Sequence, residues 1–531
     1  SLEELKEKIT MLGTSLDKID EHEIIVGVPA NRPDLLDESG LSRALNSFIG
    51  AKLGVKQYKI NKSNYKVVIE KSVNEVRPYT ACAVVKNLKL NDKRIKQIIQ
   101  LQEKLHITFG RNRKKVAIGI YPLEHIKFPI RYLARKPEEI KFIPLDTEEE
   151  MYANEILEKH NAGKEYGHLL KNVKVYPLFM DADDNILSMP PIINSEHTGR
   201  VTEKTKDVFI ECSGFNFEIL KKCLNIIVTS LADLGGEIYK NELNYQNRKE
   251  VTPNLEPEEM KLNINYVNRI LGLNLNENNI KELLEKMGYS YVNKKVLIPS
   301  YRADILHEID LVEDVGIAYG YNNFKEEIPN VATIGGEDEF YVFKEKIANL
   351  LVGFNLLEIK NYNLTNKNNL NEKMNVNNEV IMLTNSLSQD YNCLRSWIIP
   401  SLLETLSKNK HHEYPQNTFE IGNIFKKGES ETGAIEQERM AIALCHAKAN
   451  FTEIKQILDS LLNSLGLNYE VIETEHPSFI PGRVGRIIVN DKRIAYMGEI
   501  HPKVLLSWNL DLPVVALELN LTDLYELIKN A

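Results

Sequence analysis

The sequence has little cysteine. It contains five cysteines in 531 residues, and no two of them have the Cys-x-x-Cys spacing. An odd number without that spacing indicates neither a disulfide framework nor a zinc site. We therefore expect a protein of a reducing compartment, the cytoplasm.

Long apolar runs and an excess of positive charge are also missing. No run of 18 apolar residues and no signal peptide occurs, so we expect no contact with a membrane. Lys and Arg number 66 against 75 Asp and Glu, which gives a net charge of −9. This balance provides no general attraction to RNA, so any RNA contact must come from a local patch. The basic residues 111–115 are one candidate, although a solvated turn before a strand is the preferred interpretation.

Motifs of several self-contained enzymes are absent as well. The sequence has no His-Glu-x-x-His motif and no serine–histidine–aspartate order. Residues 480–487 (IPGRVGRI) contain two glycines but lack the Gly-Lys-Ser/Thr of a phosphate-binding loop. We interpret them as the approach to a β-hairpin that turns at Asn490 and Asp491.

The remaining composition predicts an α+β multidomain protein. Hydrophobic residues make up 43% of the chain, enough for real cores, and the length suggests three or four domains. Leu220, Leu224, Ile227 and Leu231 follow a 3.6-residue period and predict a helix that ends at Gly235. The polar stretches 246–259 and 328–339 predict linkers. The predicted domains are an N-terminal α/β domain (1–75), a mixed α/β domain (76–250), a winged-helix-like unit (253–328) and a C-terminal domain (335–531). Because the chain starts with Ser1 and not Met, we also expect a short N-terminal piece to be missing.

Acidic residues concentrate on one predicted helix. Asp310, Glu313 and Asp314 lie at i, i+3 and i+4, on the face that two apolar stripes leave free. Like charges at these spacings destabilise a helix by about 0.2–0.5 kcal/mol per pair. Solvent, a basic partner surface or a hard cation such as Mg²⁺ would each offset that repulsion. Asp304, the predicted N-cap, lies off this face.

Five segments in a fixed order resemble the phenylalanyl-tRNA synthetase beta subunit family of the archaeal and eukaryotic type. The resemblance is specific and covers nearly the whole chain. Its segments are NRPDLLDESGLSRAL (31–45), LSMPPIINSEHTGRVTEKTKDVFIECSG (187–214), PSYRADILHEIDLVEDVGIAYGYNNF (299–324), NSLSQDYNCLRSWIIPSLLETLSKN (385–409) and GRVGRI with YMGEIHPKVL (482–505).

The resemblance implies a heterotetramer of two alpha and two beta chains. It would charge tRNA(Phe) with phenylalanine, and the alpha chain would bind ATP and phenylalanine and carry the synthetic active site. We therefore expect no catalytic residue for aminoacylation on this chain. The 76–250 domain would be an editing domain, and 335–531 a non-catalytic class II synthetase-like domain built on an antiparallel sheet.

The resemblance also implies a magnesium ion at the acidic helix. The family pattern R-x-D-I…D-L-x-E-[ED]-V corresponds to Arg302, Asp304, Asp310, Glu313 and Asp314. It therefore adds Asp304 to the three acids that share a helix face. A site at the boundary between alpha and beta chains would relieve the charge repulsion only on assembly.

An editing pocket is expected on chemical grounds. A pocket for phenylalanine rejects an isostere that adds a hydroxyl by only about 10²-fold, so a second site that hydrolyses tyrosyl-tRNA(Phe) is useful. The resemblance implies that Ser188, Asn194, Glu211 and Ser213 form it, polar side chains set among apolar ones. Relatives often carry Asp and Thr in place of Glu211 and Ser213. The alternative is that Ser188 and Asn194 only cap turns beside the adjacent prolines.

Two other functions stay open at this point. One is a free-standing RNA-binding or trans-editing protein derived from the beta subunit, which would use the winged-helix-like unit and residues 111–115. The other is an autonomous hydrolase that uses only residues 76–250. Co-purification with an alpha chain separates both from the synthetase subunit.

Overall fold

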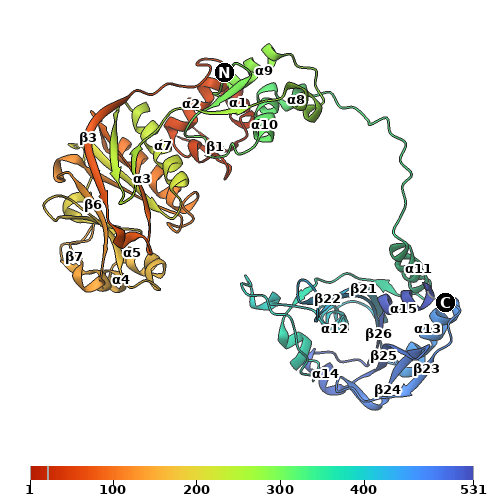
Figure 1. Ribbon diagram of the computed structural model, residues 1–531. Helices are drawn as coiled ribbons and strands as arrows, with labels where there is room; N and C mark the ends of the chain where they lie inside the picture. Colours follow the sequence, from red (N-terminus) through yellow and green to blue (C-terminus); the bar gives the residue numbers. More distant parts are fainter. Residues whose placement is uncertain (1, 21–22, 530–531) are drawn as a thin grey trace. The chain divides into compact units, whose positions relative to one another are not determined.

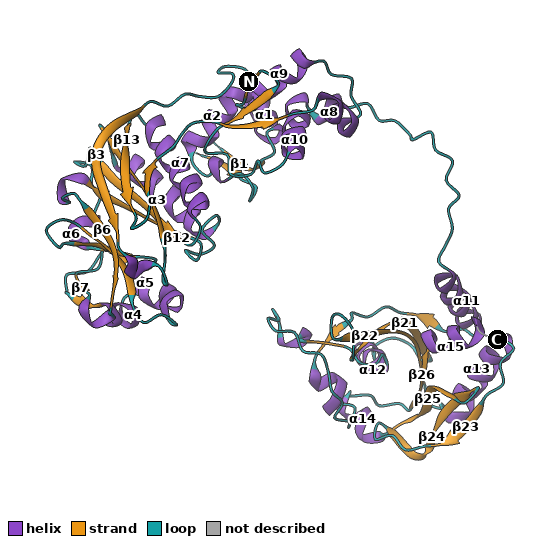
Figure 2. Cartoon of the chain, viewed as in Figure 1, coloured by secondary structure: helices purple, strands orange, loops and turns teal. Residues whose placement is uncertain are grey.

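The computed structural model describes residues 2–20 and 23–529 (Figures 1 and 2). The chain divides into two compact units, Ser1–Ile328 and Pro329–Ala531. Each unit combines helices with β-sheets. A mixed α/β, multidomain architecture is therefore confirmed.

The first unit opens with a small helical layer and a hairpin. Helix α2 begins at Asp37, whose carboxylate accepts the Gly40 backbone N–H and so caps the helix. The elements of this segment are α1 (Leu2–Met11), β1 (Ser15–Ile19), β2 (Ile24–Gly27) and α2 (Glu38–Phe48).

A ten-stranded sheet forms the centre of the first unit, with the order β11-β10-β9-β6-β3-β13-β4-β12-β5 and with β14 paired to β13. Helices α3 (Asp92–Ile107) and α7 (Phe217–Asp233) pack on one face through a shared apolar core (Figure 2). The strands are β3 (Ile60–Ile69), β4 (Tyr79–Lys86), β5 (Val116–Pro122), β6 (Ile130–Arg135), β9 (Tyr176–Met180), β10 (Ile186–Met189), β11 (Ile193–Asn194), β12 (Val208–Gly214), β13 (Glu237–Asn244) and β14 (Lys249–Thr252). Smaller elements beside them are β7 (Lys141–Phe142), β8 (Met151–Tyr152), α4 (Ala153–Lys159), α5 (Asn161–Tyr166) and α6 (Glu196–Gly199).

The sheet extends beyond the predicted domain limits. Strand β3 precedes residue 76, yet it pairs in parallel with both β13 and β6. The predicted linker 246–259 contains β14, which pairs with β13. Polar composition suggested a linker there because β14 is a short edge strand, on which polar side chains face solvent.

Residues 258–319 form two short helices followed by a third. A three-stranded sheet with the order β15-β17-β16 packs beside them. The elements are β15 (Glu258–Lys261), α8 (Ile264–Leu271), α9 (Glu277–Lys286), β16 (Ser290–Val292), β17 (Lys295–Ile298) and α10 (Glu308–Tyr319).

The second unit is built on a seven-stranded sheet with the order β18-β21-β22-β26-β25-β24-β23. Neighbouring strands are antiparallel except for the parallel pair β18 and β21. Alternate residues of β22 enter different cores: Met440 and Ile442 lie in one, Ala441 and Ala443 in the other. The sheet is therefore covered on both faces. Its strands are β18 (Leu357–Glu358), β21 (Gln416–Lys427), β22 (Ala434–Cys445), β23 (Glu470–Glu473), β24 (Phe479–Val489), β25 (Lys492–Ile500) and β26 (Val514–Asn520). The other elements are α11 (Glu339–Gly353), β19 (Leu364–Thr365), β20 (Cys393–Leu394), α12 (Ile399–Lys408), α13 (Phe451–Ser464), α14 (Pro502–Ser507) and α15 (Leu521–Lys529).

A buried ion pair stabilises this second unit. Arg395 Nη1 lies 2.6 Å from Glu420 Oε1, and both side chains are 0% exposed. Replacing one partner leaves the other charge buried and alone, so we expect Arg395→Met to lower the free energy of unfolding by about 3–5 kcal/mol. The exposed pair of Lys427 with Glu379 provides the control, because Lys427→Met should cost at most about 1 kcal/mol. Urea denaturation of both variants measures the difference, and equal losses would contradict it.

Candidate editing pocket and acidic helix

A small cavity in the first unit brings together three of the four predicted editing residues. Ser188, Asn194 and Glu211 line a space of about 110 Å³. Ser188 on β10 and Asn194 on β11 lie directly opposite each other in the antiparallel register. Glu211 comes from β12, which pairs with β4 and β5. Strand geometry, and not only turn capping, therefore positions these polar side chains.

Glu211 is buried beside a tyrosine that the sequence did not single out. Glu211 is only 1% exposed to solvent. The Tyr121 hydroxyl lies 3.3 Å from Glu211 Oε1 and 3.4 Å from Asn194 Oδ1. Glu211 Oε2 is buried without a hydrogen-bond partner among the described residues. A buried carboxyl oxygen with no partner is costly, which makes it a natural acceptor for a ligand.

Gly119 makes room for this arrangement. It lies opposite Glu211 in the register of β5 and β12. A Cβ atom at this position would come within 2.0 Å of the Tyr121 hydroxyl and 2.7 Å of Glu211 Oε1. The side-chain-free residue is therefore required by the close approach of these two groups.

Ser213 lies beside the cavity and does not line it. It is two residues beyond Glu211 on β12, so both side chains project from the same face. Arg77 Nε lies 3.3 Å from Ser213 Oγ, and Arg77 Nη2 donates to the Ser213 carbonyl at 2.7 Å. Ser213 therefore holds the buried Arg77 near Glu211.

The basic turn at residues 111–115 contributes one side chain to the cavity. Arg113 lines it, donates to the Ile192 carbonyl at 2.9 Å and lies 4.2 Å from the centre of the Tyr166 ring. Arg111 and Lys114 stay exposed. The preferred interpretation, a turn before a strand, is confirmed, but its central arginine points inward. The run of positive φ angles at residues 111–113 turns it there, and charge counting does not detect this.

His106 is a second lining residue that sequence reasoning missed. Its Nε2 accepts the Ile118 backbone N–H at 2.8 Å, and Glu103 lies 3.1 Å from its Nδ1. Burial lowers the pKa of His106, so the ring is neutral at pH 7. A neutral ring is required because Nε2 accepts a hydrogen bond.

Burial changes the protonation of Glu211. Desolvation raises the pKa of Glu211 to about 8, against the opposing influence of Arg77 and of the Tyr121 and Ser213 hydroxyls. The folded protein therefore keeps this proton where the unfolded chain, with an ordinary glutamate pKa of about 4.3, has lost it. Stability linked to this group is fully present below that value and is lost as the pH rises to about 8.

This linkage predicts a pH-dependent effect of Glu211→Gln. The amide has the same shape and does not ionise. We expect the variant to unfold with the same free energy as the parent near pH 4, and to be more stable by a few kcal/mol at pH 8.5, at about 1.4 kcal/mol for each unit of pKa shift. Urea denaturation at the two pH values measures the change. A difference between the proteins that does not vary with pH would contradict the raised pKa.

The acidic helix is arranged differently from the prediction. Helix α10 is capped by His307, so the prediction that Asp304 is the N-cap is wrong. Asp304 instead accepts two hydrogen bonds from Arg302, at 2.8 and 2.6 Å. The same guanidinium donates to Asp314 Oδ2 at 2.7 Å, and the Tyr289 hydroxyl donates to that oxygen as well. Arg302, two residues before Asp304, therefore offsets much of the charge repulsion.

The other two acids face elsewhere. Asp310 Oδ2 accepts the backbone N–H groups of Leu306 and His307, both at 2.7 Å, and so supports the start of α10. Glu313 is exposed. In residues 2–20 and 23–529, no group of three or more His, Cys, Asp or Glu side chains is arranged to hold a metal ion. On their own, these four carboxylates do not fit a magnesium ion, because Arg302 occupies two of them.

A membrane span requires a helix of sufficient length and apolarity. Within the described part of the chain, no helix is both long and apolar enough to cross a bilayer.

Three family models match successive parts of the chain. The model described as "B3/4 domain" matches residues 62–230, and "tRNA synthetase B5 domain" matches residues 260–321. The model described as "Phenylalanyl tRNA synthetase beta chain CLM domain" matches residues 325–521.

Individual relatives are similar over nearly their whole length. The "Phenylalanine--tRNA ligase beta subunit" of Thermococcus sibiricus is 45% identical over 522 residues, which cover 96% of this chain and 93% of the relative. The protein of the same name from Pyrococcus horikoshii is 46% identical over 501 residues, 93% of this chain and 90% of the relative. A crystal structure of an N-terminal fragment of the Pyrococcus horikoshii phenylalanyl-tRNA synthetase beta subunit is 43% identical, with a TM-score of 0.58. It covers 60% of this chain and 95% of that fragment.

Proposed function

Since the chain belongs to the family of phenylalanine--tRNA ligase beta subunits, we propose that it is the beta subunit of an enzyme that joins phenylalanine to tRNA(Phe) at the expense of ATP. The similarity to relatives of that name over 96% of the chain carries this proposal. The alpha subunit binds ATP and phenylalanine and performs the synthesis, and two alpha chains assemble with two beta chains. The beta chain contributes assembly, tRNA contacts and editing.

The editing activity is the hydrolysis of tyrosyl-tRNA(Phe) in the ten-stranded-sheet domain. The proposed pocket consists of Ser188, Asn194 and Glu211, with Ser213 holding Arg77 beside them. The tyrosine phenol would hydrogen-bond to Glu211, whose Oε2 has no partner in the described part of the chain. Phenylalanine has no hydroxyl, so it leaves that oxygen unpaired and binds more weakly.

The domain organisation is proposed on the same basis. An N-terminal α/β domain, an editing domain, a winged-helix-like domain and a non-catalytic class II synthetase-like domain follow one another. The three-stranded sheet with α8, α9 and α10 supports the third assignment, and the mainly antiparallel seven-stranded sheet supports the fourth.

Magnesium binding at the acidic helix requires a second chain under this proposal. A cation would have to share Asp304 and Asp314 with Arg302, which already donates to both, so its further ligands would have to come from the alpha chain. Glu313 is exposed and, among the described residues, has no side-chain partner, so its carboxylate is available to bind a cation. A magnesium ion takes few carboxylates and keeps several waters, which suits such a shared site.

Glu313 therefore provides a clean test of the magnesium site. We expect Glu313→Gln to raise the magnesium concentration needed for alpha–beta assembly by about tenfold, a usual loss when a metal site is weakened. The fold should survive, because the Glu313 side chain is exposed and has no partner in residues 2–20 and 23–529. Asp310→Asn is less informative, since Asp310 also holds the start of α10. Light scattering during a magnesium titration measures assembly, with the exposed Glu326→Gln as control. Equal curves for the two variants would remove Glu313 from the site.

Assembly itself tests the proposed function. We expect a tagged form of this chain, expressed with the alpha subunit from the same genome, to co-purify with it in a one-to-one ratio. A free-standing trans-editing or RNA-binding protein would elute alone. Failure to retain the alpha chain at any magnesium concentration would contradict the subunit assignment.

A further inference from the structure

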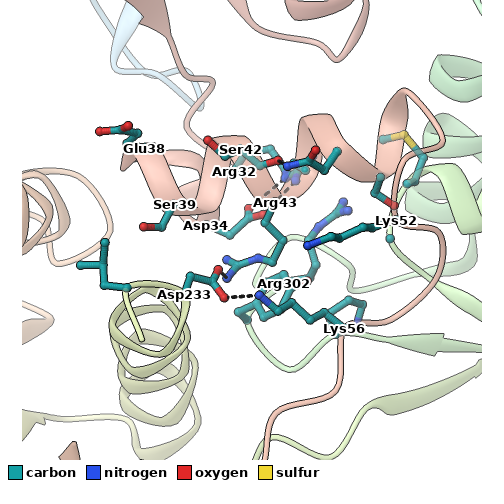
Figure 3. A pocket seen from close by; sticks show the side chains of 18 of the residues that line it. Arg32, Asp34, Glu38, Ser39, Ser42, Arg43, Lys52, Lys56, Asp233 and Arg302 are labelled. Atoms are coloured by element: carbon teal, nitrogen blue, oxygen red, sulfur yellow. Dashed lines mark hydrogen bonds and ion pairs between the residues drawn. The ribbon is translucent and has the colours of Figure 1, made fainter. Parts of the chain in front are cut away.

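A larger cavity lies where several segments of the first unit meet. It has a volume of about 550 Å³, and residues of α2, of the loop at 52–56, of the start of α3, of the end of α7 and of residues 287–302 line it. Figure 3 shows Lys52 and Lys56 extending from their loop toward Asp233 at the end of α7. The volume exceeds that of the editing pocket several times, and the two cavities share no lining residue.

The carboxylates that line this cavity are already neutralised. Asp34 accepts two hydrogen bonds from Arg32, at 2.9 and 2.8 Å. Asp233 pairs with Arg43 at 2.6 Å and with Lys56 at 2.5 Å. The third, Glu38, lies 3.6 Å from Lys93 in an exposed pair. Each acid therefore has a cation of its own within the lining.

Positive charge remains after these pairs are formed. Within the described residues, the Arg94 side chain donates to the Lys89 carbonyl and has no acidic partner, so its charge is not compensated. Lys52 is exposed and, within the described residues, its side chain has no hydrogen bond or ion pair. Arg302 is balanced from behind by Asp304 and Asp314, which are not part of the lining. The cavity therefore presents more cationic than anionic groups to a ligand.

Besides the excess of positive charge, a buried nitrogen of Arg302 without a partner in the described part of the chain also points to a ligand. The Arg302 side chain is 2% exposed. Nε and Nη2 donate to the two aspartates, whereas Nη1 is buried and has no hydrogen-bond partner among the described residues. A buried N–H donor of a guanidinium carries a desolvation penalty that a ligand oxygen would remove. The two carboxylates fix the guanidinium plane, and Arg302 is one of the residues that line the cavity.

We propose that this cavity binds a phosphate group, held by Arg302 Nη1 and by the Lys52 ammonium. Phosphate oxygens suit both groups, because arginine donates directional hydrogen bonds to them and lysine acts as a mobile point charge. The phosphate comes from one of two sources, the backbone of bound tRNA or a free pyrophosphate-bearing compound. The tRNA source rests on the proposed function, whereas the free source does not.

Lys52→Ala tests the site with little risk to the fold, because the side chain contacts no partner among the described residues and the backbone bond to the Asn46 carbonyl is kept. Lys66→Ala is the matched control: Lys66 is exposed on β3, is not part of the lining, and has no side-chain partner in the described range. The full-length chain is titrated with a fluorescent tRNA(Phe) transcript at several salt concentrations, and separately with inorganic pyrophosphate in a calorimeter. Losing one exposed charge contact should weaken binding of the ligand that occupies the cavity, whether tRNA or pyrophosphate, by roughly fivefold. For tRNA it should also flatten the slope of log affinity against log salt by about 0.7–0.9.

Each outcome decides one point. Weaker tRNA binding with unchanged pyrophosphate binding assigns the cavity to the RNA backbone, and the reverse assigns it to a free phosphate compound. If Lys52→Ala and Lys66→Ala bind each probe with the same affinity, the proposal is overturned. Arg302→Lys keeps the charge and removes Nη1, so it should weaken binding of the same probe. Its thermal unfolding midpoint is measured alongside to show that the variant is folded. Charging by the alpha–beta mixture is measured in parallel, so a failure of the proposed function is seen separately from a failure of this site.

Discussion

The purified chain alone is expected to form no phenylalanyl-tRNA, and the mixture with its alpha subunit is expected to form it at an ordinary enzymatic rate. The sequence contains no phosphate-binding loop, and the seven-stranded sheet bears apolar cores on both faces. Buried ion pairs, such as Arg395 with Glu420, fill polar positions of the sheet region. The chain's own side chains therefore cover both faces of this sheet.

Two assays measure this difference. Incorporation of radiolabelled phenylalanine into tRNA(Phe) reports the whole reaction, and exchange of pyrophosphate into ATP reports adenylate formation alone. The alpha subunit without this chain is the necessary control, because it shows whether the beta chain is required for activity. Formation of phenylalanyl-adenylate by the beta chain alone would contradict the division of labour proposed here. Hydrolysis of tyrosyl-tRNA(Phe) without any contact to an alpha chain would favour the trans-editing alternative.

Local elements of the fold were predictable because local sequence determines them. The period of Leu220, Leu224, Ile227 and Leu231 predicted a helix, and α7 spans Phe217–Asp233. The hairpin expected at Asn490 and Asp491 joins β24 to β25, and both residues adopt the positive φ that tight turns require. In both cases the pattern and the structure lie within about twenty residues of chain.

Long-range pairing was not predictable in the same way. Strand β3 joins β13, about 180 residues later, and its alternating pattern does not specify that partner. Tyr121 escaped attention for the same reason, since it meets Glu211 only because β5 pairs with β12. Side chains that complete a pocket from a neighbouring strand carry no signal in their own segment.

The acidic helix shows what a charge pattern does not reveal. Of its three acids, Asp314 is paired with Arg302, and the same guanidinium also binds Asp304. Arg32 and Asp34, which also line the large cavity, form the same two-bond Arg-x-Asp arrangement. The spacing was visible in both places, but without the fold nothing indicated that the arginine turns back onto the aspartate.

Glu211→Ala is expected to abolish discrimination against tyrosine while phenylalanine charging continues. The alanine removes the acceptor for the phenol and leaves the cavity apolar on that side. An unpaired buried hydroxyl costs about 1–3 kcal/mol, so clearance of tyrosyl-tRNA(Phe) should fall by roughly 10–100-fold. Deacylation of preformed tyrosyl-tRNA(Phe) by the assembled complex measures this rate, and Glu237→Ala, on an exposed position of β13, is the control.

Glu211→Gln separates recognition by shape and hydrogen bonding from recognition by charge. Because burial raises the pKa of Glu211 to about 8, the carboxyl is mostly neutral at pH 7 and resembles the amide. We therefore expect the glutamine variant to retain part of the editing rate at pH 7, where the alanine variant retains little. The rate of the parent should change as the pH passes about 8, whereas that of the glutamine variant should not. If both variants clear tyrosyl-tRNA(Phe) at the parent rate, the phenol binds elsewhere and Glu211 only fills the core of the domain.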